Sequence, residues 1–134
     1  MENVLKRWRP YIEEKEFEIM NVFFKNVCNK TPTGRLMIIK GPGKTGKTTF
    51  VSQVVDIIGA RYISHISDKV DKDLIFVSEP AINSNIFSAK QIEDIKHKVD
   101  ESKSLIMICN DIDIPKEIEQ YCEIIEFKHL FDAN

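Results

Sequence analysis

The stretch Gly41-Pro42-Gly43-Lys44-Thr45-Gly46-Lys47-Thr48 decides how this chain folds. It satisfies the pattern Gly-x4-Gly-Lys-Ser/Thr at every position, and three of the chain's five glycines lie inside it. The apolar run 35–40 directly precedes it, and an amphipathic helical pattern follows from Lys47 to about Ile58. A buried strand, a glycine-rich loop and a helix in this order indicate a phosphate-binding loop.

The residue types of the loop suit a phosphate ligand. Glycines let the backbone N–H groups turn inward around phosphates, in conformations that are closed to residues with a Cβ. We expect Lys47 to reach the β and γ phosphates, Thr48 to bind Mg²⁺ and Thr49 to hydrogen-bond the α phosphate. The alternative is a glycine-rich turn that binds nothing. The predicted nucleotide-binding residues are Gly41, Pro42, Gly43, Lys44, Thr45, Gly46, Lys47, Thr48 and Thr49.

Outward from the loop, apolar runs alternate with helical patterns. Strands are expected near 62–66 and over 74–77, 105–109 and 123–127, and a helix from 88 to about 101 opens with a Ser-x-x-Gln capping box. This alternation predicts an α/β fold with a mostly parallel sheet. The strand near 62–66 is expected at an edge, with an antiparallel direction as one option, because the link to the next strand is too short for a helical crossover.

The first 32 residues predict a small helical segment that precedes a core of residues 33–134. Val4, Leu5 and Trp8 have helical spacing, Pro10 interrupts the pattern, and a second helix is expected up to about Asn29. The aromatic side chains of this segment are interpreted as its core and not as a platform for stacking bases; they are Trp8, Phe17, Phe23 and Phe24.

The composition bounds the class of protein. With 134 residues, of which 43% are hydrophobic and 30% charged, the chain has room for one domain with a sizeable core. No apolar run reaches the roughly 20 residues of a membrane span, and residues 1–9 do not resemble a signal peptide, so we expect a soluble intracellular protein. Cys28, Cys109 and Cys122 are interpreted as core thiols without a disulfide or a zinc site.

Charge is distributed unevenly along the chain. Residues 1–47 hold ten Lys or Arg against five acids, and residues 48–134 hold nine against sixteen. This polarity favours two interpretations equally, a basic face for phosphate or nucleic acid and a head-to-tail contact between subunits. The three histidines show no ligand or catalytic spacing and are interpreted as surface or edge residues; they are His65, His97 and His129.

Hydrolysis would need a ligand for Mg²⁺ and a group that orients the attacking water. Ser78 and Glu79 follow the apolar strand 74–77, at the sheet edge where α/β proteins bind ligands. Ser78 stands where an Asp is usual and brings no charge, so Glu79 is the expected principal acid. Asn110 follows the strand 105–109 and is expected to hydrogen-bond a γ phosphate or the water. The expected catalytic residues are Lys47, Glu79 and Asn110, and the expected metal ligands are Thr48, Ser78 and Glu79.

Both polar positions also have simpler explanations. Glu79 would then be an exposed residue that ends a strand, and Asn110 would make a turn with Asp111.

The loop, Ser78-Glu79 and Asn110 lie in this order within about 70 residues. Over roughly residues 33–128 the chain thereby resembles the superfamily 3 helicases of DNA viruses and plasmids, which are compact relatives of the AAA+ ATPases. The stretch from Ile114 to Phe127 is similar to the end of that family's core. The resemblance implies a P-loop NTPase fold with sheet order 5-1-4-3-2, ATP and Mg²⁺ as cofactors, and rings that move along single-stranded DNA during replication.

The chain departs from the family's pattern at two places. The family has an arginine before its last strand that enters the neighbouring subunit's ATP site, whereas the matching residues here are Gln120-Tyr121-Cys122. Lys116 and Lys128 are substitutes without the planar fork of an arginine, so a partner would have to supply that cation. Between Glu79 and Ser104 there is little room for the family's DNA-gripping hairpin. The basic residues there are interpreted as a solvated helix face; they are Lys90, Lys96, His97 and Lys98.

Three functions follow from these observations. The first is an ATP-hydrolysing motor domain of superfamily 3 helicase type that acts in replication, in the cytoplasm or, for a viral protein, also in the host nucleus. The second is a nucleotide-binding module without motor activity. The third is a P-loop nucleoside or nucleotide kinase, which the scarcity of late arginines disfavours, because none lies beyond Arg61 to form a lid.

Overall fold

Helices alternate with strands along the chain. The structure, a computed structural model, describes residues 2–31, 33–41, 46–58, 61–63, 74–77, 88–109 and 114–127, with the backbone alone at 48, 55, 61–63, 74–77 and 109. The helices are α1 (Glu2–Trp8), the 3-10 helix η1 (Arg9–Tyr11), α2 (Glu14–Cys28), α3 (Lys47–Ile58), α4 (Ala89–Asp100) and α5 (Lys116–Glu119). The strands are β1 (Arg35–Lys40), β2 (Arg61–Ile63), β3 (Leu74–Val77), β4 (Ser104–Cys109) and β5 (Cys122–Glu126).

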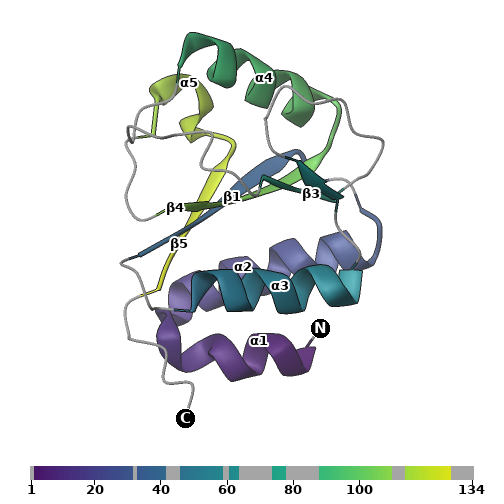
Figure 1. The fold of residues 1–134 in the computed structure, drawn as a ribbon, viewed down its shortest axis with the longest axis vertical. Helices are drawn as coiled ribbons and strands as arrows, with labels where there is room; N and C mark the ends of the chain where they lie inside the picture. Colours follow the sequence, from purple (N-terminus) through teal and green to yellow (C-terminus); the bar gives the residue numbers. More distant parts are fainter. Residues whose placement is uncertain are drawn as a thin grey trace.

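The strands form one sheet in which every neighbouring pair is parallel. Their order is β2-β3-β4-β1-β5, which reads 5-1-4-3-2 from the other edge. Helices α1, α2 and α3 lie on one face of the sheet, and α4 and α5 lie on the other (Figure 1). The strand that leads into the glycine-rich loop, β1, is therefore covered on both faces and flanked on both sides, which explains its continuous apolar sequence.

Successive side chains of β1 enter two separate cores, as the alternation of a strand requires. Met37 and Ile39 pack with the helices α1, α2 and α3, whereas Leu36 and Ile38 pack with α4 and α5. All four side chains are at most 1% exposed. The same alternation in β4 sends Ile106 to the first core and Leu105 and Met107 to the second. This double burial holds the end of β1 at a fixed place.

The N-terminal helices pack against the sheet and α3. As predicted, the aromatic residues Trp8, Phe17, Phe23 and Phe24 are buried, with exposed fractions between 0% and 6%. They share one core with Phe50 and Val54 of α3 and with Ile125 of β5. Pro10 ends α1 as expected, because it lies in the 3-10 turn η1 and Ile12 beyond it is extended. Residues 1–31 thus contribute much of one core of the sheet.

The edge strand β2 and the short helix α5 differ most from the sequence-based expectation. The strand expected near 62–66 is Arg61–Ile63, at the edge as predicted, but it runs parallel to β3, so the antiparallel option is wrong. The two strands have only three and four residues, so ten residues are enough chain to connect the end of β2 to the start of a parallel β3. The helix α5 was not expected, since one turn is too short to show periodicity. The predicted capping box at Ser88 and Gln91 is present.

The interpretation of the cysteines as core thiols is wrong for Cys28, which is exposed at the end of α2. Cys122 is partly buried, and its Sγ donates a hydrogen bond of 3.3 Å to the Ile118 carbonyl oxygen. Burial raises the pKa of the Cys122 thiol to about 11, an effect that the Arg35 guanidinium opposes. The Cys109 side chain lies outside the described residues.

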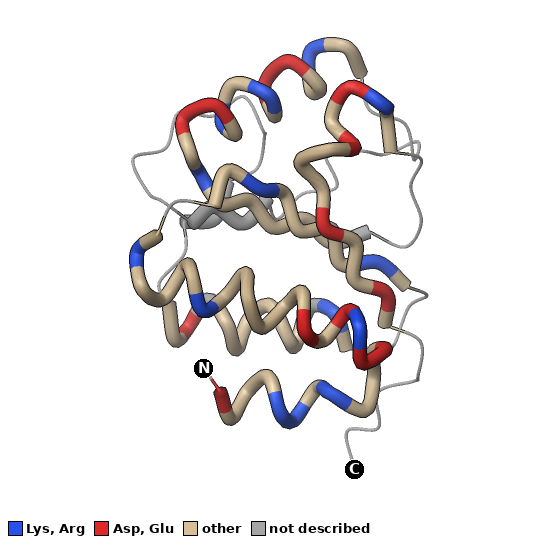
Figure 2. The backbone as a smooth tube through the Cα atoms, turned by 180° about the vertical axis from the view of Figure 1, so that it is seen from behind, with Lys and Arg blue, Asp and Glu red and all other residues tan. Residues whose placement is uncertain are grey.

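Charges of both signs are interspersed on the helices. Figure 2 shows both Lys or Arg and Asp or Glu along α2 and α4, while β1 and β4 are mostly uncharged. His97, at the end of α4, has a 77% exposed side chain 3.5 Å from Glu101, in agreement with a surface role. His65 and His129 lie outside the described residues. None of the described helices is both long enough and apolar enough to cross a bilayer.

The two described thiols should differ in reactivity. At pH 8, a pKa of about 11 leaves only about one thousandth of Cys122 as thiolate, so maleimide labelling of the native protein should reach Cys28 first. Labelling of Cys122 should accelerate as the pH rises toward 11. Peptide mass spectrometry measures both sites, with urea-unfolded protein as the control. Equal labelling of the two thiols in native protein would contradict the burial of Cys122.

Candidate functional site

The glycine-rich loop begins where β1 ends. Lys40 is the last residue of β1, Gly41 follows it, and Gly46 precedes the first turn of α3. Pro42, Gly43, Lys44 and Thr45 lie outside the described residues, and Thr48 is described only by its backbone. Thr49 is exposed on the first turn of α3. Both ends of the predicted loop are therefore defined, and the strand and helix that flank it are those that the motif requires.

Both described glycines of the loop have backbone conformations that favour glycine. Gly41 has a φ of +150° and Gly46 a φ of +85°. A Cβ on Gly41 would also lie 2.4 Å from the Phe127 carbonyl oxygen, closer than any real Cβ contact. The Gly46 carbonyl accepts the Phe50 N–H at 2.9 Å and so begins the hydrogen bonding of α3. The first glycine of the motif is thus required both by its φ and by the neighbouring chain.

Lys47 is the first residue of α3, and its side chain reaches back to the residue at which the loop begins. Its ammonium donates a hydrogen bond to the carbonyl oxygen of Gly41, six residues earlier. The side chain is only 7% exposed, although lysines are almost never buried without a partner. Gly41, the first residue of the predicted motif, and Lys47, its next-to-last residue, are therefore in direct contact. A buried cation at the start of a helix is a suitable site for an anion.

Two glutamates fix the last residues of β5 next to the loop. Glu126 faces Lys40 across the strand pair, with Nζ and Oε2 3.9 Å apart. The backbone N–H of Glu126 donates to Oε1 of Glu16, on α2, at 2.5 Å. The Phe127 N–H then donates to the Lys40 carbonyl at 2.8 Å. The chain that touches Gly41 is thus held from β1 and from α2.

The predicted acid and amide lie beyond the described residues, but the strands before them are described. Ser78 and Glu79 would follow β3, and Asn110 would follow β4. Lys40 and Cys109, the residues before Gly41 and Asn110, are register partners in parallel strands. The carboxyl ends of β1 and β4 therefore reach the same edge of the sheet, where open α/β sheets bind ligands.

An arginine from β1 reaches the chain segment just before β5. Arg35 donates from Nη1 to the Gln120 carbonyl at 2.6 Å and from Nη2 to Glu123 at 2.6 Å. Its side chain is 35% exposed. Sequence reasoning along the last strand missed this residue, because Arg35 is 85 positions away in the chain. No local signal in the sequence indicates the pairing.

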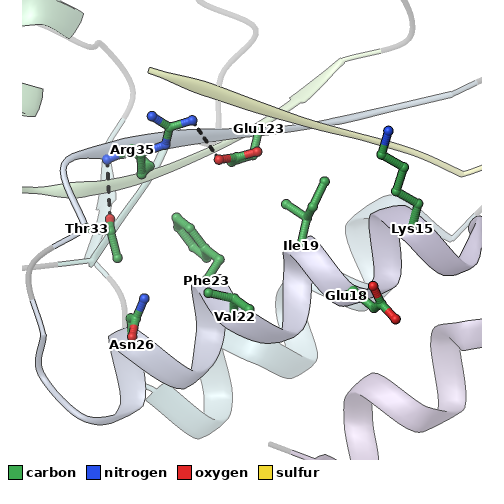
Figure 3. Close-up of a pocket in the computed structure, with 9 residues that line it drawn as sticks. All are labelled: Lys15, Glu18, Ile19, Val22, Phe23, Asn26, Thr33, Arg35 and Glu123. Atoms are coloured by element: carbon green, nitrogen blue, oxygen red, sulfur yellow. Dashed lines mark hydrogen bonds and ion pairs between the residues drawn. The ribbon is translucent and has the colours of Figure 1, made fainter. Parts of the chain in front are cut away.

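A hollow of about 540 Å³ lies away from the loop, between α2 and the beginnings of β1 and β5 (Figure 3). It is lined by apolar side chains and by two residues of each charge, and Arg35 and Glu123 form an ion pair on its sheet side. Its two basic and two acidic residues balance, and Arg35 is already paired with Glu123. The hollow therefore has no excess positive charge that would bind a polyphosphate. The lining residues are Lys15, Glu18, Ile19, Val22, Phe23, Asn26, Thr33, Arg35 and Glu123.

Comparisons with known proteins find similarity of structure alone. No protein-family model matches the chain, and no curated protein matches its sequence. The structure of Rhizobiales Trip13 aligns with a TM-score of 0.49 and 18% identity, over 96% of this chain and 54% of that one. The structure of C. elegans PCH-2 aligns with a TM-score of 0.48 and 13% identity, over 98% and 47%. The chain spans about half the length of each of these two proteins. Its function is therefore inferred from its own phosphate-loop motif and sheet.

Replacing Gly41 by alanine should destabilise the fold. The new Cβ would meet the Phe127 carbonyl, and the φ of +150° is unfavourable for alanine, so we expect a loss of about 2 to 4 kcal/mol in the free energy of unfolding. The control is Gly34→Ala, where φ is +56° and the nearest atom is 3.2 Å away, with an expected loss of about 1 kcal/mol. Urea denaturation measures both. A Gly41→Ala protein as stable as the control would refute the close contact.

Proposed function

We propose that the chain binds ATP at Gly41–Thr49 and hydrolyses it with Mg²⁺, as a P-loop ATPase. The observation that carries the proposal is the contact of the buried Lys47 ammonium with the Gly41 carbonyl, within a complete phosphate-loop motif. Two positive-φ glycines at the ends of the loop and the strand-to-helix geometry support it. A hydrogen bond to a loop carbonyl keeps the ammonium at the place where phosphate oxygens would replace that carbonyl as its partner.

Each site residue has a role in this proposal. Lys47 contacts the β and γ phosphates, and the hydroxyl of Thr48 and the side chains of Ser78 and Glu79 hold Mg²⁺. The metal ion, when bound, neutralises charge on the phosphates. Glu79 also orients the attacking water, and Asn110 hydrogen-bonds the water or the γ phosphate. The structure describes Gly41, Gly46 and Lys47, whereas the roles of Thr48, Ser78, Glu79 and Asn110 are assigned from the sequence.

A narrower form of the proposal is a motor domain of superfamily 3 helicase type, acting as a ring on single-stranded DNA in replication. It is supported by the order of the motifs at 41–49, 78–79 and 110 along the chain. The rival is a nucleotide-binding module without motor activity. Gln120, which stands where that family has its arginine, favours the rival, because this side chain carries no charge.

Arg35 bears on this choice. Its guanidinium lies at the Gln120 carbonyl, so a cation is present beside the position that the helicase type uses, although it is paired with Glu123. A working ring would require Arg35, Lys116 or a partner's arginine to complete the neighbouring site. An isolated chain is accordingly a slow ATPase, since a trans-acting arginine contributes on the order of 10³ to 10⁵ in rate.

Nucleotide binding should depend on Lys47. Lys47→Ala removes the buried cation of the loop, and we expect the affinity for a fluorescent ATP analogue to fall at least about tenfold while the fold persists. The matched control is Lys40→Ala, which removes a cation one residue before the loop, where Lys40 only forms a 3.9 Å pair with Glu126. Fluorescence titration gives both affinities. Equal affinities of the Lys47 variant and the parent would eliminate the phosphate-loop assignment.

Hydrolysis should depend on Glu79 more than binding does. Glu79→Gln keeps the shape of the side chain and removes its basicity, so ATP should still bind while turnover falls about 10²-fold or more. Phosphate release under saturating ATP and Mg²⁺ measures turnover, and the same titration measures binding. Asp73→Asn is a control for the loss of one acid elsewhere in the chain. Turnover equal to that of the parent would show that Glu79 has no catalytic role and only follows a strand.

A further inference from the structure

Phe127 joins the end of the sheet to the phosphate loop. Its N–H donates to the Lys40 carbonyl at 2.8 Å, and its own carbonyl oxygen occupies the space where a Cβ of Gly41 would be. Its ring is fully buried. Any displacement of this ring would therefore move backbone that lies directly against the first glycine of the loop.

Trp8, in α1, packs against the Phe127 ring. The indole lies 5.9 Å from the Phe127 ring and 5.9 Å from the Phe50 ring, measured between centroids. Phe50 and Phe127 are in turn 5.6 Å apart. Phe50 lies one helical turn after Lys47, so the three aromatic rings, which we call the aromatic triad (Trp8, Phe50 and Phe127), connect α1 to both ends of the loop.

A hydrogen bond fixes the indole within the aromatic triad. Trp8 Nε1 donates to Oε1 of Gln53 at 2.8 Å, and Gln53 lies on α3 near Phe50. The indole is fully buried, so it keeps this orientation only while a hydrogen-bond acceptor stays in place. The position of α1 and the position of α3, which begins with Lys47, are consequently linked.

We propose that Trp8 is a positioning residue for the phosphate loop, so that the docking of α1 and the binding of nucleotide are coupled. This inference rests on the proposed function and adds to it a dependence on the N-terminal helix. Trp8 acts through Phe127 on Gly41 and through Phe50 and Gln53 on the first turn of α3. Because coupling is reciprocal, nucleotide binding must stabilise α1 in its docked position.

Leu5 is a matched control on the same helix. It is 3% exposed and belongs to the same core, so its truncation also removes buried apolar contacts. The Leu5 side chain, however, is aliphatic, so it cannot donate a hydrogen bond to Gln53, and it does not belong to the aromatic triad. If Trp8 were only a core residue, Trp8→Ala and Leu5→Ala would affect nucleotide binding alike once the loss of stability is taken into account.

The experiment compares nucleotide affinity with stability in four proteins: the parent, Trp8→Ala, Trp8→Phe and Leu5→Ala. Affinity for a fluorescent ATP analogue is measured where circular dichroism shows each protein to be folded, and urea midpoints give the stabilities. Trp8→Ala should lose at least about fivefold in affinity, and Leu5→Ala less than about twofold. Trp8→Phe, which keeps an aromatic ring but lacks the indole N–H, should be intermediate. The Phe variant is informative even where Trp8→Ala does not fold.

A second readout does not depend on substitutions. Hydrogen exchange of the α1 amides in the parent should slow more than that of the α4 amides when nucleotide is added, because stabilisation of the whole fold protects both helices whereas coupling protects α1 in addition. If the parent does not bind the analogue, the proposed function itself fails. If the parent binds it, but the Trp8 variants bind equally well and α1 exchange slows no more than α4 exchange, only the coupling is refuted.

Discussion

The close packing of Gly41 against the Phe127 carbonyl is the constraint on which the rest of the site depends. A Cβ at Gly41 would lie 2.4 Å from that oxygen, so the chain can leave β1 in this direction only if the residue is glycine. The contact exists because β5 pairs in parallel with β1 and ends beside it. The same pairing places the Phe127 carbonyl against Gly41, and the Phe127 ring enters the core that contains Phe50 of α3. The glycine of the motif therefore serves the sheet as well as a phosphate ligand.

The N-terminal helices belong to this arrangement and do not merely precede it. Trp8 and Phe24 are fully buried in the core that contains Phe50, and Glu16 on α2 accepts the N–H of the residue before Phe127. The residues that flank the loop, Gly41 and Lys47, are thereby supported from β1, β5, α3 and both N-terminal helices. Fixing these two residues in advance lowers the entropy that ligand binding would cost. It also makes the phosphate loop sensitive to a helix that is more than thirty residues away in the sequence.

Much of the fold could be predicted from the sequence because its signals are local. The run 35–40, the glycine motif and the Ser88 capping box indicate their elements by residue type and spacing, and the structure contains the strand β1, the helix α3 and the capped helix α4. Contacts between distant residues leave no such signal. The Arg35–Glu123 pair, the Trp8–Gln53 hydrogen bond and the direction of β2 follow from packing and strand pairing, and none could be predicted. Cys28 was interpreted as a core thiol because the cysteines lack disulfide or zinc spacing, a pattern that carries no information about the exposure of one residue at the end of α2.

If the loop recognises phosphate, ligands that carry phosphate should stabilise the unmodified chain against heat. The decisive measurement is therefore the melting temperature of this chain with different ligands. A ligand that binds only the folded state at one hundred times its Kd adds about 2.7 kcal/mol to stability. We expect ATP with Mg²⁺ and inorganic triphosphate both to raise the melting temperature, whereas adenosine, which has no phosphate, should leave it unchanged. A chain whose melting temperature is unchanged by ATP and triphosphate at millimolar concentrations, or is raised equally by adenosine, would contradict phosphate recognition by the loop.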